Sequence, residues 1–121
     1  MDDMEFIRKM KELLPELDTE MGMEYCGSDE SIYAMVIATY AEDRLDEKIE
    51  NAFSSENWTD YTTFAHAIKS SSLTLGLEEL SEYAKSFEFA GKEGNIDYIK
   101  NNHSELVKKY CRVLDAINSA Q

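Results

Sequence analysis

The sequence predicts an all-α protein, an up-and-down antiparallel four-helix bundle with an additional short N-terminal helix. Apolar residues recur at helical spacing along most of the chain, and good helix formers fill the positions between them. Only five glycines and one proline interrupt 121 residues, of which 43% are apolar. A chain of this size can bury one core, so we expect a single helical-bundle domain over residues 1–121.

Two short elements precede the bundle. Residues 4–14 carry one apolar stripe and stop before the lone proline, Pro15, which predicts a short amphipathic helix. The stripe comprises Phe6, Ile7, Met10, Leu13 and Leu14. Residues 17–25 have the length for another turn or two of helix. We expect the first helix to cover one end of the bundle.

The first arm of the bundle follows a loop at residues 26–29, where Ser28 or Asp29 can cap a helix. The apolar stripe of that helix comprises Ile32, Tyr33, Val36, Ile37 and Tyr40. A second apolar group with a four-residue rhythm comprises Leu45, Ile49, Ala52 and Phe53. This group either continues the same helix or starts a new one after a kink, because the spacing is compatible with both arrangements.

The next two helices are predicted to form an antiparallel hairpin. Asn57 or Thr59 can cap a helix that ends near Leu75 and Gly76, since glycine favours a left-handed C-terminal cap. The return helix has a buried stripe of Leu77, Leu80, Ala84 and Phe87, and residues 91–95 end it. A long last helix has its stripe at Ile96, Ile99, Leu106, Tyr110, Val113 and Ile117.

His66 faces away from the predicted core. With about 100° of rotation per residue, His66 and Ser70 lie about 160° from Ile68, the centre of the buried stripe of their helix. The residues expected within about 60° of that centre are Tyr61, Phe64, Ala65, Ser72 and Leu75. An imidazole opposite the core, with a lysine three residues on and a small residue four residues on, belongs to a surface.

The return helix is expected to place Glu88 beside this histidine. His66 lies about ten residues before the turn, so a residue about ten positions after it, near Phe87 and Glu88, should face it. Glu88 falls within an apolar stripe, where a carboxylate is unusual without a partner. We expect it to accept a hydrogen bond from Nδ1 of His66, which leaves Nε2 free as a nucleophile. Alternatively, Glu88 turns to solvent or pairs with Lys85 or Lys92.

Two lysines are placed to act with the histidine. Lys69 lies one turn along the same helix, where its ammonium can approach the oxygens of a phosphoryl group on His66. Lys92, one turn beyond Glu88, can assist. Three other positions are candidate docking contacts for a partner: Ser70, Leu73 and Phe89.

The stretch around His66 resembles the core motif of the histidine-containing phosphotransfer (Hpt) domain of two-component phosphorelays. That motif reads His, any residue, an aliphatic residue, Lys, Gly, two small residues and then Leu-Gly. The matching positions are His66, Ile68, Lys69, Ser71, Ser72, Leu75 and Gly76. The resemblance extends over essentially the whole chain, from Leu14 and Pro15 to Gly94. Ser70 stands where the family usually has glycine, which lets a partner approach the histidine closely.

The resemblance implies a reaction and a set of partners. His66 would take a phosphoryl group from the phospho-aspartate of a receiver domain and pass it to another aspartate, reversibly, while Lys69 and Glu88 assist. The partners would be receiver domains of response regulators or of a hybrid sensor kinase. The chain would need no cofactor of its own, because the receiver domain supplies Mg²⁺. An ATP-binding signature and a Gly-rich phosphate loop are absent, so we expect a phosphorelay carrier without kinase activity.

A second hypothesis keeps the fold without the chemistry. The same helical hairpin would then bind a receiver domain or another regulator as a non-phosphorylated interaction module. We also expect a stand-alone carrier, since Met1 and a complete bundle argue against a fragment of a larger hybrid kinase. His103 lacks comparable neighbours and is interpreted as structural or incidental. No spacing typical of a zinc site, an EF-hand or a nucleophile elbow occurs.

Charge and hydropathy restrict the surroundings in which the chain can act. The 25 acidic and 12 basic residues give a net charge of -13, which argues against binding to nucleic acid or anionic lipid. The N-terminus lacks an apolar signal region, and no stretch approaches the roughly 18 apolar residues of a membrane span. Cys26 and Cys111 are interpreted as reduced thiols. We expect a cytoplasmic monomer whose partners are proteins with basic docking surfaces.

Overall fold

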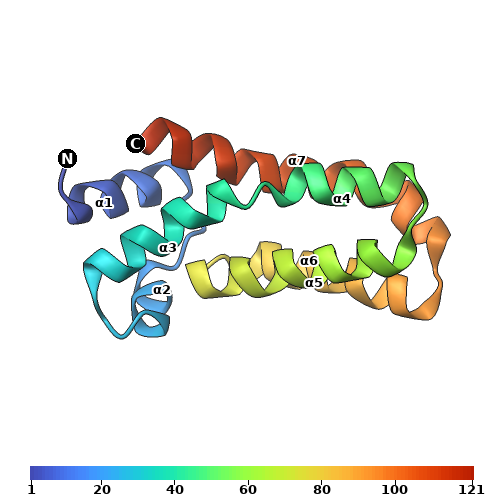
Figure 1. The fold of residues 1–121 in the computed structure, drawn as a ribbon. Helices are drawn as coiled ribbons and strands as arrows, with labels where there is room; N and C mark the ends of the chain where they lie inside the picture. The colour runs from blue at the N-terminus through green and yellow to red at the C-terminus, as the bar shows by residue number, and fades with distance from the viewer.

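The computed structural model describes residues 1–121 and contains seven helices and no strand (Figure 1). The helices are α1 (Asp3–Leu13), α2 (Thr19–Tyr25), α3 (Glu30–Glu42), α4 (Leu45–Ser54), α5 (Trp58–Leu75), α6 (Glu78–Glu93) and α7 (Ile96–Ala120). The helices α3 and α4 follow one another as one arm of a bundle whose other three arms are α5, α6 and α7 (Figure 1). The predicted all-α four-helix bundle is confirmed.

The N-terminal segment adds two helices to the bundle. The carboxylate of Asp2 caps α1 by accepting from the backbone N–H of Glu5, and α1 packs against α3 and α7. The short second helix predicted near residues 17–25 is present as α2. The prediction that Leu13 is buried is wrong. The helix ends at Leu13, and the chain then turns so that Leu14 and Leu17 fill the core instead.

The first arm is broken, which decides between the two arrangements that the spacing allowed. Arg44 has a left-handed backbone with φ of 49°, so α3 stops at Glu42 and α4 starts again at Leu45. Tyr110 of α7 joins the two pieces, because its hydroxyl accepts from the backbone N–H of Leu45 and donates to the carbonyl of Tyr40. These two hydrogen bonds from α7 therefore stabilise the kink between α3 and α4.

Asp29 is the residue that caps α3, since its carboxylate accepts from the backbone N–H groups of Ser31 and Ile32. The predicted burial of Ile32 is wrong, because that side chain is exposed. The inward face of α3 runs through Tyr33, Ile37 and Tyr40, and Ile32 lies about 100° away from the first of these.

The predicted hairpin of α5 and α6 is confirmed. Asn57 caps α5 by accepting from the backbone N–H of Asp60, so the helix begins at Trp58. Gly76 ends it in the left-handed conformation, with φ of 100°. A Cβ atom at Gly76 would lie 2.1 Å from the carbonyl oxygen of Asp18, so the N-terminal segment can approach only a glycine here. The backbone N–H of Asp18 donates to the carbonyl of Gly76, which fastens the turn to the start of α2.

His103 of α7 is buried in the core, where it contacts side chains of α4 and α5. Its ring stacks on Phe53 with a centroid distance of 4.0 Å. The hydroxyl of Tyr61 lies 2.8 Å from Nδ1, and the carboxylate of Glu50 lies 2.6 Å from Nε2. Because a carboxylate accepts, Nε2 donates to Glu50, and in the neutral imidazole Nδ1 then accepts from the hydroxyl of Tyr61. These contacts tie α4, α5 and α7 together, which is a structural use of this histidine.

Candidate functional site

The face of α5 that carries His66 points to solvent, as the periodicity predicts. The side chain of His66 is 57% exposed, whereas Ile68, two residues on, is fully buried. Of the residues predicted to share the buried stripe, Tyr61, Ala65, Ser72 and Leu75 are buried, and Phe64 is half-buried. The hydroxyl of Ser72 forms a hydrogen bond with that of Tyr40 at 2.9 Å inside the bundle.

Glu88 of α6 lies against His66, as the count from the turn predicts. One carboxylate oxygen, Oε2, is 2.9 Å from Nδ1 of the imidazole, and the side chain of Glu88 is only 7% exposed. A carboxylate can only accept, so Nδ1 carries the proton and donates it. In the neutral imidazole, the other ring nitrogen, Nε2, then holds a lone pair, and the side chain is exposed. This is the geometry of an oriented nucleophile.

Glu88 also binds both candidate lysines. Nζ of Lys69 is 2.8 Å from Oε1, and Nζ of Lys92 is 3.0 Å from Oε2. The sequence suggested a pair between Glu88 and Lys92 only as an alternative to the contact with His66, and it did not suggest one with Lys69. Both pairs exist together with the histidine contact. Lys85 is not part of the group, since its ammonium lies over the ring of Phe89.

The charge of Glu88 is held in place by these neighbours. Burial alone raises the pKa of this carboxyl, but hydrogen bonds from Lys69, Lys92 and His66 outweigh it and lower the pKa from 4.5 to about 2. Glu88 therefore stays ionised at neutral pH. A buried carboxylate with three cationic or donor neighbours satisfies the requirement that buried charges be paired.

The three candidate docking residues are exposed, and one of them also touches the histidine. Leu73 continues the exposed face of α5, and Phe89 of α6 stands beside Glu88 in the sequence. Ser70 is exposed as well, and its hydroxyl oxygen lies 3.4 Å from Nε2 of His66. The contact between Ser70 and the imidazole was not foreseen.

Two further contacts hold the site together and were missed. A Cβ atom at Gly91 would lie 2.0 Å from Oγ1 of Thr62, so α5 and α6 approach more closely there than any other residue permits. The hydroxyl of Ser81 donates to the backbone carbonyl of Lys69 at 2.9 Å. The helix α6 ends at Glu93 with Gly94 as its cap, within the predicted range of residues 91–95. The glycine three residues after Glu88 was the one feature of the sequence that could have indicated this close approach of the two helices.

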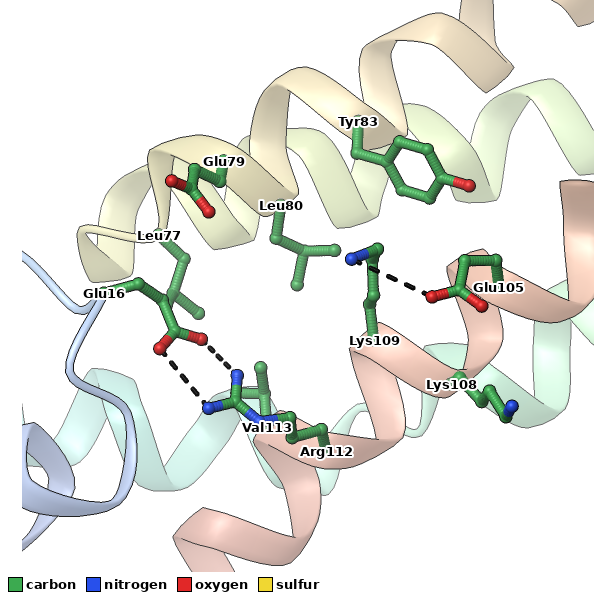
Figure 2. A pocket seen from close by; sticks show the side chains of 10 residues that line it. All are labelled: Glu16, Leu77, Glu79, Leu80, Tyr83, Glu105, Lys108, Lys109, Arg112 and Val113. Atoms are coloured by element: carbon green, nitrogen blue, oxygen red, sulfur yellow. Dashed lines mark hydrogen bonds and ion pairs between the residues drawn. The ribbon is translucent and has the colours of Figure 1, made fainter.

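A groove of about 520 Å³ lies between α6 and α7, and it contains neither His66 nor Glu88 (Figure 2). Its floor is apolar and includes Leu80 and Val113. Charged side chains at its rim pair with each other, as in the ion pair of Arg112 with Glu16 (Figure 2). No three His, Cys, Asp or Glu side chains gather in a way that could hold a metal ion. None of the seven helices is long and apolar enough to span a membrane.

Comparison with known proteins identifies the family of this chain. Searches of curated proteins and of solved structures found no match. The family model of the Hpt domain matches residues 4–115, from the first helix into the last, and includes both arms of the hairpin that bring His66 and Glu88 together. On that match the chain belongs to the Hpt domain family.

Proposed function

We propose that this protein carries a phosphoryl group on Nε2 of His66 and passes it between aspartates of receiver domains in a phosphorelay. Membership of the Hpt family supports a histidine phosphotransfer role in phosphorelays. The observation that carries the assignment to this residue is the contact of Nδ1 with the buried carboxylate of Glu88 at 2.9 Å. It leaves Nε2 as the exposed nitrogen with a free lone pair.

The transfer needs no proton movement at the reacting nitrogen. Nε2 attacks the phosphorus of a receiver phospho-aspartate, and the N–P bond forms as the P–O bond to the aspartate breaks. The electron pair of the broken bond leaves with the aspartate as a carboxylate. Nδ1 keeps its proton, so the phosphorylated ring is positively charged, and the carboxylate of Glu88 stabilises it. In the reverse direction, the positive ring is a good leaving group, so the same site can pass the phosphoryl group on.

Lys69 and Lys92 would change partners during this reaction. In the free protein both ammonium groups bind Glu88, and Lys69 is 27% and Lys92 59% exposed. A phosphoryl group on Nε2 brings two negative charges to the same surface, so a lysine that turns toward it offsets them. When a lysine turns away from Glu88, the carboxylate of Glu88 is left to pair with the positively charged ring. The Mg²⁺ needed for transfer is expected on the receiver domain.

The partner would meet the exposed face of the hairpin. Ser70 and Leu73 on α5 and Phe89 on α6 offer contacts around the histidine. A net charge of -13 favours receiver domains with basic docking surfaces. These would belong to response regulators or to a hybrid sensor kinase. We further propose that the protein acts as a cytoplasmic monomer.

Incubation with phosphorylated receiver domains and Mg²⁺ tests this function. The wild-type protein should gain a phosphate that is labile in acid and stable in base, as a phosphohistidine is. His66→Gln should gain none, and because it keeps His103, the same experiment tests the second histidine. Receivers that bind the wild-type protein without ever labelling it would favour the non-phosphorylated interaction module. Label on His66→Gln would exclude His66 as the acceptor.

A further inference from the structure

The hydroxyl of Ser70 behaves differently from its neighbours on α5. Four other hydroxyls on this helix donate to the backbone carbonyl four residues earlier, which is the usual arrangement for serine and threonine in a helix. They belong to Thr62, Thr63, Ser71 and Thr74. Ser70 instead directs its hydroxyl at Nε2 of His66, with an O–N distance of 3.4 Å.

The direction of this contact follows from the other side of the ring. Nδ1 of His66 donates to Glu88, so a neutral imidazole has only a lone pair at Nε2. The hydroxyl of Ser70 is therefore the donor. At 3.4 Å the hydrogen bond is long, so it fixes the ring weakly and is easily given up.

We propose that Ser70 is a positioning residue for phosphotransfer: its hydroxyl donates to Nε2 before transfer and to a phosphoryl oxygen after it. This rests on the proposed function of His66. Phosphorylation replaces the lone pair with a group whose charged oxygens lie on the same side of the ring. A hydrogen bond to a charged oxygen is stronger than a long one to a neutral nitrogen. Ser70 therefore stabilises phospho-His66 more than it stabilises the free histidine.

Three variants separate the effect of the Ser70 hydroxyl from that of the bulk of its side chain. Ser70→Ala removes the hydroxyl and keeps Cβ, Ser70→Thr keeps the hydroxyl, and Ser70→Gly removes both. Each variant is equilibrated with a phosphorylated receiver and Mg²⁺, and the ratio of phospho-His66 to phospho-receiver is measured. Ser70→Ala should lower this ratio about 3- to 10-fold, and Ser70→Thr should restore it. If Ser70→Ala matches the wild-type ratio within about twofold and only Ser70→Gly differs, bulk alone acts and the proposal is wrong.

A second measurement does not depend on phosphorylation. In the free protein, ¹⁵N NMR of the imidazole reports whether Nε2 accepts a hydrogen bond. The Nε2 resonance should move downfield in Ser70→Ala and stay near the wild-type position in Ser70→Thr, while the Nδ1 resonance stays unchanged. An unchanged Nε2 resonance in Ser70→Ala would overturn the proposal. If wild-type protein takes no phosphoryl group from any receiver, the proposed function fails, and this resonance still decides whether Ser70 contacts His66.

Discussion

Replacing Glu88 with glutamine removes the negative charge that His66, Lys69 and Lys92 share. The pKa of Glu88 is about 2 in the folded protein and 4.5 ordinarily. A carboxyl whose pKa falls on folding contributes stability that is fully present above pH 4.5 and is lost as the pH falls toward 2. At about 1.4 kcal/mol for each unit of pKa, the shift from 4.5 to about 2 corresponds to about 3.5 kcal/mol at most. Lys92 is largely exposed and screened by solvent, so we expect about 1–2 kcal/mol.

Urea unfolding of wild-type protein and of Glu88→Gln between pH 7 and pH 2 measures this contribution. The free energy of unfolding of the variant should be lower by about 1–2 kcal/mol at pH 7, and the difference should shrink below pH 4.5 and approach zero near pH 2. Glu82→Gln is the matched control, since Glu82 is an exposed carboxylate of α6 without an ion pair. A difference for Glu88→Gln that is the same at pH 7 and pH 2 would refute the reasoning.

Three further substitutions probe the packing of the bundle and the chemistry of the site. Gly91→Ala should destabilise the fold by about 1–2 kcal/mol in denaturant unfolding, because its Cβ atom would clash with Thr62. In a Thr62→Ala background this loss of stability should largely vanish. An equal loss in both backgrounds would contradict the contact between Gly91 and Thr62. Tyr61→Phe should cost about 1–3 kcal/mol in thermal or urea unfolding, because it leaves Nδ1 of the buried His103 without a donor, and no measurable loss would speak against that hydrogen bond. Lys69→Ala should slow transfer from a phosphorylated receiver about 10-fold or more in rapid-quench kinetics, with a smaller loss for Lys69→Arg, whereas equal rates for all three proteins would exclude a role for the charge.

Much of the site could be predicted because it depends on local rules. The 3.6-residue period of α5 places His66 on the opposite face from Ile68, whatever else the helix packs against. Gly76 marks the turn, and the constant rise per residue then brings Glu88 beside the histidine. A carboxylate at a buried position also indicates a partner, because burying an unpaired carboxylate costs free energy.

The remaining features depend on distances between helices, which a single sequence does not give. Lys69 reaches Glu88 because α5 and α6 lie close together, and that closeness depends on Gly91 meeting Thr62. The contact of Ser70 with Nε2 depends on one rotamer of a short side chain. The apolar periodicity also does not determine the residue at which a helix ends. Leu13 fits the stripe of α1 by spacing, yet the chain turns there and leaves it exposed.

The most direct test of the account is the position of the phosphoryl group on the imidazole. After transfer from a phosphorylated receiver to ¹⁵N-labelled protein, heteronuclear NMR identifies which ring nitrogen of which histidine is bonded to phosphorus. We predict a single N–P bond at Nε2 of His66, with Nδ1 still protonated and hydrogen-bonded to Glu88. Phosphorus on Nδ1, or on any residue other than His66, would contradict it.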